Sequence, residues 1–115
     1  MNKILVEVSI GELLDKISIL EIKQDKIKDL EKLKFINEEH SILNNQLSKN
    51  VKSDEKLNSL FSSLKSINSK LWVIEDEKRQ CEKDKNFTDQ FIKLSRDVHF
   101  LNDDRAKIKL EINNY

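Results

Sequence analysis

The stretch Leu57–Cys81, LNSLFSSLKSINSKLWVIEDEKRQC, decides the fold of this chain. Its apolar residues recur at alternating spacings of three and four, which is the repeat of one face of an α-helix. Lys78 is the only charge on this face, whose members are Leu57, Leu60, Leu64, Ile67, Leu71, Ile74, Lys78 and Cys81. The pattern predicts a long amphipathic helix over about residues 54–84.

A second stretch with the same alternation follows after a short polar connection. Its apolar face consists of Phe91, Leu94, Val98, Leu101, Arg105, Ile108, Ile112 and Tyr115. We expect a helix here over about residues 88–114, with Thr88 as its N-cap. Two such helices joined by a short connection predict an antiparallel helical hairpin.

The N-terminal half predicts two shorter helices. Ser9 and Glu12 form a capping box, in which each side chain reaches the backbone N–H of the other, so a helix begins at Ser9 and runs over about residues 9–28. The apolar register then shifts near Asp29, which we expect to cap a further helix over about residues 30–48. The polar residues 48–54 have turn composition and predict the linker to the hairpin.

The residues before Ser9 are aliphatic and β-branched, and they predict a short extended segment over residues 3–8. Ile4, Val6 and Val8 would lie on one side of it. A single strand has no pairing partner in a helical chain. We therefore expect this segment to lie along a helix or to pair with the same segment of a second copy.

Composition agrees with one all-α domain over residues 1–115, an antiparallel bundle of three to four helices. The 115 residues include no proline and one glycine, and charged and hydrophobic residues each make up 37%. Lys plus Arg and Asp plus Glu both number 21, so no net field attracts nucleic acid or anionic lipid. The chain carries no membrane-spanning run and no signal peptide pattern, which predicts a cytoplasmic protein.

The sequence contains no clear motif for binding a metal ion or a cofactor. The single cysteine, Cys81, lies on an apolar helix face and predicts a buried thiol. His40 and His99 lack the spacing of a metal-binding pair, so we expect no metal site. One glycine cannot build a glycine-rich phosphate loop, and we expect no cofactor.

Polar and charged residues gather in three blocks, one in the first predicted helix and one in each helix of the hairpin. For most of them the simplest interpretation is a solvated helix face with weak pairs between charges three or four residues apart. The same residues are our candidates for a binding site: Glu12, Asp15, Lys16, Glu21, Lys23, Trp72, Glu75, Asp76, Asn102, Arg105 and Lys109.

Arg105 differs from the other candidates because it interrupts an apolar helix face. A guanidinium buried there needs a carboxylate partner, since desolvation of an unpaired charge is costly. The hairpin register places Glu75 about 12 Å from Arg105 along the axis, which is too far for one arginine to span. We therefore expect a partner from the first helix (Glu12, Asp15 or Glu21) or from a second subunit. Within the hairpin we expect Glu75 or Asp76 to pair with Arg96.

The three blocks resemble an uncharacterised family of small helical proteins from bacteria and their phages. They are Val6–Lys16 with Ile19–Lys23 (VEVSIGELLDK and ILEIK), Leu71–Asp76 (LWVIED) and Asn102–Asn113 (NDDRAKIKLEIN). The resemblance covers nearly the whole chain and implies a small domain of unknown function. It singles out the candidate residues above, and Glu111 with them.

Two functions fit these observations. The first is a non-catalytic interaction or accessory protein that forms a homo-oligomer, most simply a dimer, because a slender hairpin leaves apolar surface exposed. The alternative is a small helical enzyme or binding protein for an anionic metabolite. In that case Lys16, Lys23, Arg105 and Lys109 would surround the anion, with Glu12, Asp15 or Glu75 as the acid or base.

Overall fold

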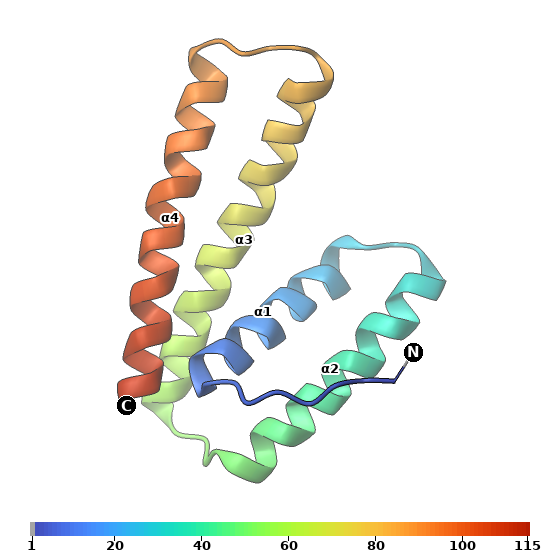
Figure 1. Cartoon of the computed structure of the whole chain (residues 1–115), viewed down its shortest axis with the longest axis vertical. Helices are drawn as coiled ribbons and strands as arrows, with labels where there is room; N and C mark the ends of the chain where they lie inside the picture. Colours follow the sequence, from blue (N-terminus) through green and yellow to red (C-terminus); the bar gives the residue numbers. More distant parts are fainter. Residues whose placement is uncertain (1) are drawn as a thin grey trace.

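The computed structural model describes residues 2–115 and shows four α-helices and no strand in that range (Figure 1). The helices are α1 (Ile10–Lys26), α2 (Leu30–Asn50), α3 (Glu55–Lys83) and α4 (Asp89–Asn114). With 17, 21, 29 and 26 residues they make up more than three quarters of the chain. The predicted all-α class is confirmed.

Side-chain caps begin the first three helices. The Ser9 hydroxyl accepts a hydrogen bond from the backbone N–H of Glu12 (3.1 Å), as the capping box predicts. Asp29 accepts from the backbone N–H groups of Glu31 and Lys32, so its predicted role is also confirmed. Asp54 caps α3 in the same way, through the N–H of Leu57 (2.7 Å).

The predicted cap at Thr88 was wrong in its chemistry. Thr88 stands at the N-cap position of α4, but its side chain makes no cap hydrogen bond. Its hydroxyl donates instead to the Oδ1 atom of Asn86 (2.6 Å), because the turn brings that amide within reach. In the same turn Lys85 has a φ of 54°, the left-handed region that usually holds glycine.

The helices form two antiparallel hairpins, α1 with α2 and α3 with α4, and α1 packs against the second of them (Figure 1). α3 and α4 are the long hairpin, and α1 packs against both of them as well as against α2. The main core lies at this junction and includes Leu14, Leu57, Leu64 and Ile112. α1 is therefore the central helix, and it makes the main contacts between the two hairpins, with Leu47 at the end of α2 packing against the same core.

Gly11 lets α1 approach α4 closely. A Cβ atom at this position would lie 2.6 Å from the carbonyl oxygen of Lys109 and 2.8 Å from the Oδ1 atom of Asn113. The Gly11 N–H donates to that same Oδ1 atom at 2.7 Å, so α4 supplies a cap for the first turn of α1. The only glycine of the chain is thus required by helix packing.

The far end of the long hairpin extends beyond α1 and α2 (Figure 1). Cys81 and Leu94 are buried between α3 and α4 there, as predicted for the thiol. The ammonium of Lys78 lies 5.8 Å from the centre of the Phe91 ring. This cation–π contact accounts for the one charge on the apolar face of α3.

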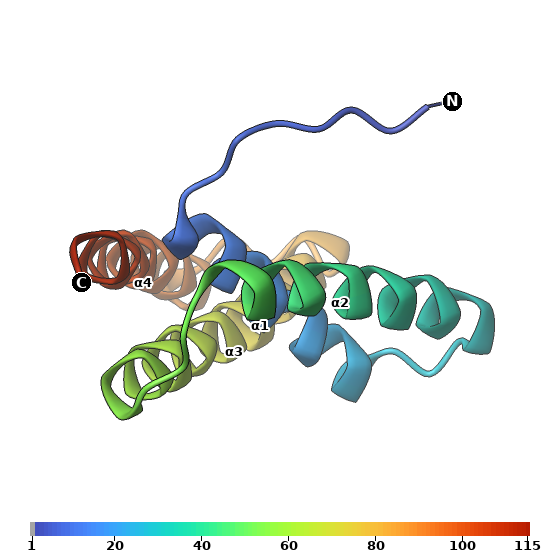
Figure 2. The same ribbon diagram turned by 90° about the horizontal axis from the view of Figure 1, so that it is seen from below.

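Residues 2–8 form neither helix nor strand and run clear of the helices as an extended arm (Figure 2). We call Asn2–Val8 the N-terminal arm. Its aliphatic side chains are open to solvent, with Ile4 86%, Leu5 97% and Val6 74% exposed. The arm does not lie along a helix of its own chain, so the first of the two expected positions was wrong.

Candidate functional site

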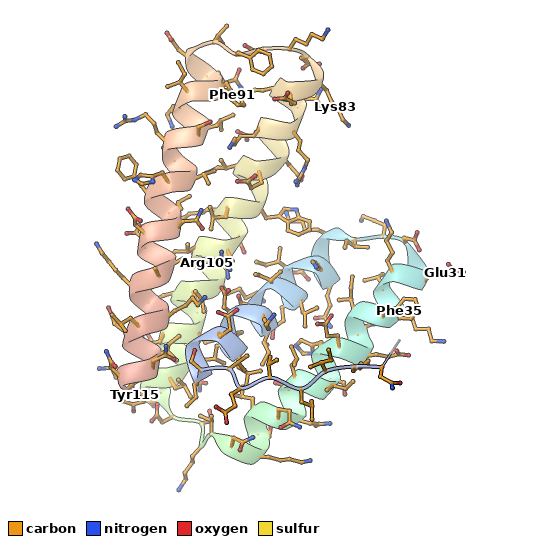
Figure 3. The ribbon with its side chains drawn as sticks, in the orientation of Figure 1. Glu31, Phe35, Lys83, Phe91, Arg105 and Tyr115 are labelled. Carbon is orange, nitrogen blue, oxygen red and sulfur yellow. The ribbon has the colours of Figure 1, made fainter. Side chains whose placement is uncertain are left out.

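Asp15 is the centre of the polar cluster at the junction of α1, α3 and α4. Its side chain is only 2% exposed, and both carboxylate oxygens accept hydrogen bonds from Arg105. The Nε atom of Arg105 lies 2.9 Å from Oδ1, and its Nη2 atom binds Oδ2. Figure 3 shows Arg105 on the side of α4 that faces α1. The prediction of a carboxylate partner from the first helix is confirmed.

Two polar side chains that the sequence did not indicate complete this cluster. The amide of Asn68 on α3 donates to Oδ1 of Asp15 (2.8 Å) and to the Ser18 hydroxyl (2.7 Å). The Ser18 hydroxyl in turn donates to the backbone carbonyl of Asp15 (2.7 Å). Among the residues described, no buried side-chain polar atom is left without a partner. The buried carboxylate of α1 is therefore held by side chains from two other helices, α3 and α4.

Lys109 extends the cluster one turn further along α4. Its ammonium binds the Glu12 carboxylate at 2.7 Å and lies 3.7 Å from Oδ2 of Asp15. The Glu12 carboxylate is engaged there, so the cap hydrogen bond we expected it to make to Ser9 was wrong. The cluster therefore contains two carboxylates, of Glu12 and Asp15, and two cations, of Arg105 and Lys109, and its charges balance.

Burial and pairing oppose each other in the ionisation of this cluster. Burial raises the pKa of Asp15, but hydrogen bonds from Arg105 and Asn68 and the positive charges of Arg105 and Lys109 outweigh it. The pKa of Asp15 is therefore held below its ordinary value. The hydrogen bond to Asp15 raises the pKa of Arg105 in turn. The pair is fully charged at neutral pH.

Glu21 belongs to a separate cluster that joins α1, α2 and α3. Its two carboxylate oxygens contact His40 of α2 (3.1 Å) and Lys65 of α3 (3.0 Å). Neither His40 nor Lys65 was a candidate, because a single histidine or lysine on a polar helix face has many possible partners. This cluster links the two hairpins in the same way as the Asp15 cluster.

A small cleft lies beside the Asp15 cluster, between the second half of α1 and the hairpin. It has a volume of about 260 Å³, is open to solvent and is mostly apolar. Trp72, Glu75 and Arg105 are the candidate residues that it brings together. The complete lining is Ile19, Ile22, Asn68, Leu71, Trp72, Glu75, Arg79 and Arg105.

Other candidate residues remain outside these groups. Lys16 and Asn102 are exposed, and Lys23 is half-buried. Asp76 is exposed and pairs with Arg79 on its own helix (2.7 Å). The expected contact of Glu75 or Asp76 with Arg96 was wrong, because Arg96 lies over the Phe100 ring instead (5.5 Å to the ring centre). An arginine three residues away offered Asp76 a nearer partner.

The comparisons with known proteins agree with the three sequence blocks. A family model described as "Family of unknown function (DUF6165)" matches residues 4–115. The chain belongs to this family. The DUF6165 match includes the N-terminal arm from Ile4 onward, every residue of the Asp15 cluster and the cleft. No curated protein and no solved structure matches the chain.

Two absences concern the described part of this DUF6165 chain. Residues 2–115 contain no group of three His, Cys, Asp or Glu side chains placed to hold a metal ion. None of the helices over that range has the length and apolar character needed to cross a membrane.

Proposed function

We propose that this protein is a non-catalytic interaction module that acts as a homo-oligomer, most simply a dimer. One observation carries the proposal: its clustered charges are bound to one another, while apolar side chains on the outer side of the long hairpin stay exposed. Charges engaged within the chain position helices. Exposed apolar surface is what a soluble helical protein uses to bind another chain.

The candidate acids and bases support a structural role because they neutralise one another. Arg105 binds Asp15 and Lys109 binds Glu12, so two of the four cations expected around an anion already hold carboxylates. A general base must be able to reach a substrate proton. Asp15 is buried and accepts three hydrogen bonds, which leaves it poorly placed for that role.

Two exposed apolar side chains of the hairpin line a groove between α3 and α4. Val73 (45% exposed) and Phe100 (51%) are its most prominent members. At about 100° per residue, Val73 lies about 140° round α3 from Asn68, and Phe100 about 140° round α4 from Arg105. The groove therefore opens on the side of the hairpin away from α1. It is lined by Ser66, Ser69, Lys70, Val73, Ile74, Asp97, Phe100 and Leu101.

The charges at the groove favour a second copy of this chain as its occupant. Lys70 of α3 and Asp97 of α4 both border the groove, one from each helix, and Asp97 also binds Lys93 of its own helix (2.9 Å). A twofold axis through the groove would bring Lys70 of one copy towards Asp97 of the other, twice. Such self-complementarity is what an isologous dimer requires.

Sedimentation equilibrium of the whole chain at micromolar concentration tests this proposal. We expect a mass near twice the 13.6 kDa of one chain. Phe100→Asp and Val73→Asp should each lower it to the monomer mass, because they place a carboxylate in the contact. Phe35→Asp is the matched control, since Phe35 is 69% exposed but lies on α2. A wild-type chain that sediments only as a 13.6 kDa particle contradicts the proposal.

The alternative, a binding protein for an anionic metabolite, is favoured by the cleft beside Trp72. Trp72 is the only tryptophan, so its fluorescence reports directly on that cleft. Inorganic phosphate, added up to millimolar concentration, should leave the emission unchanged if the cations serve only their carboxylates. A saturable change that Arg105→Lys abolishes would support the binding protein instead.

A further inference from the structure

The N-terminal arm is the most exposed aliphatic segment of the molecule. Ile4, Leu5 and Val6 are each at least 74% exposed, and the arm extends away from the helices (Figure 2). Its apolar residues are flanked by one charge of each sign, Lys3 and Glu7. Aliphatic β-branched side chains of this kind favour an extended strand that is paired and covered.

The sequence of the arm is complementary to itself when it is read in reverse. Lys3-Ile4-Leu5-Val6-Glu7 places opposite charges at equal distances from Leu5. In an antiparallel pair of two such strands centred on Leu5, Lys3 of each copy stands opposite Glu7 of the other. Ile4 then stands opposite Val6, and directly opposed residues are those that interact across strands.

We infer that the arms of two copies pair as an antiparallel ribbon with this register. The inference rests on the proposed self-association and names a second contact for it. Alternation along the strand places Ile4 and Val6 of both copies on one side of the ribbon, as a patch of four β-branched side chains. The two Lys3–Glu7 pairs, one at each end, select the centred register over a shifted one.

The arm contact adds to the contact at the hairpin groove. A two-stranded ribbon is marginal in water by itself, so it cannot be the whole of the interface. The arm joins α1 at Ser9, far from the tip of the hairpin, and α1 lies on the side of the hairpin opposite the groove. The two contacts therefore use different residues, so variants can separate them. In a closed dimer both contacts have to lie on the same twofold axis.

Charge reversal in the full-length chain tests the arm contact. Lys3→Glu places two glutamates against two glutamates in the homodimer, and Glu7→Lys places two lysines against two lysines. Each variant should raise the dissociation constant of self-association by about tenfold, because two cross-strand pairs change from attraction to repulsion. Lys52→Glu is the matched control, because Lys52 is exposed in the linker before α3 and carries the same change in charge.

Mixing the two variants provides a sharper result. A Lys3→Glu chain and a Glu7→Lys chain have opposite charges at both ends of a shared ribbon. An equimolar mixture should therefore recover the wild-type dissociation constant, although neither variant does so alone. The double variant Lys3→Glu/Glu7→Lys should recover it as a single species, because each arm is again complementary to itself.

The outcomes separate the arm contact from the proposed function. Lys3→Glu that behaves like Lys52→Glu, while Phe100→Asp still dissociates the dimer, overturns the arm contact and leaves the hairpin contact in place. Loss of association in both single variants without recovery in the mixture also overturns it, since the pairs then lie elsewhere. A wild-type chain that remains monomeric overturns both proposals.

Discussion

Arg105 of α4 binds both carboxylate oxygens of Asp15 of α1, and a side-chain amide from Asn68 of α3 completes the contact. Three helices that are far apart in the sequence therefore meet at one buried carboxylate. A bidentate pair of this kind has a strict geometry, so it specifies how α1 crosses the long hairpin. The energetic consequences are testable by substitution.

Removal of Arg105 alone should destabilise the fold. In Arg105→Leu the Asp15 carboxylate stays buried and loses its charged partner, which we expect to lower the free energy of unfolding by about 3 kcal/mol. Urea denaturation measures this change.

The double variant Asp15→Leu/Arg105→Leu should be less destabilised than Arg105→Leu, because no buried charge remains. Arg79→Leu, which removes an exposed pair, should cost less than about 1 kcal/mol. Equal losses for the two arginines would contradict this account.

The low pKa of Asp15 should make part of the stability depend on pH. A carboxyl whose folded pKa lies below its ordinary value of 3.8 stabilises the fold above that value. This stabilisation is lost as the pH falls through the folded pKa. The difference in free energy of unfolding between the wild type and Asp15→Asn should therefore be constant near pH 7 and shrink below about pH 4. A difference that grows towards acid pH would show the opposite shift.

Gly11→Ala should destabilise the chain, although alanine is the better helix former. At a solvent-exposed position inside a helix, the change from glycine to alanine raises the free energy of unfolding by about 0.8–1.0 kcal/mol. Here the new Cβ atom would lie 2.6 Å from the carbonyl oxygen of Lys109, so α1 has to move away from α4. We expect a net loss of about 1–3 kcal/mol in thermal or urea unfolding. Ser59→Ala, at an exposed position of α3, serves as the control and should be neutral or slightly stabilising.

Lys85→Gly should stabilise the chain. Lys85 has a φ of 54°, where a side chain costs about 1 kcal/mol that glycine avoids. The gain is partly offset by the greater freedom of glycine in the unfolded chain. A rise of a few degrees in the melting temperature is the expected result. Lys83→Gly, in the last turn of α3, should lower the melting temperature, and a parallel response of both variants would argue against the conformational explanation.

Long apolar repeats made the helices predictable, and a single exception to a repeat made the ion pair predictable. Arg105 interrupts an otherwise apolar face, so its need for a carboxylate follows from desolvation alone. The choice between Glu12, Asp15 and Glu21 could not be made from the sequence, because it depends on how α1 crosses the hairpin. In the structure Arg105 binds Asp15. Glu12 binds Lys109 instead, and Glu21 binds Lys65.

Asn68 and Gly11 were missed for related reasons. Asn68 lies next to Ile67, which the repeat placed on the buried face, but packing against α1 rotates that face so that Asn68 is 5% exposed. Gly11, the single glycine of the chain, was used only as an indicator of composition and to exclude a glycine-rich phosphate loop. A single glycine inside the first turn of a helix is a signal of close approach by another backbone, and here that backbone belongs to α4.

The end of the long hairpin that α1 does not contact should be less stable than the rest of the molecule. Near α1 three helices share one core, whereas the stretch around Cys81 and Phe91 is held by a single helix–helix interface. That end can separate locally while the junction stays folded. Since Cys81 is the only thiol and is buried in that interface, the rate at which a thiol reagent modifies it measures this local opening apart from global unfolding.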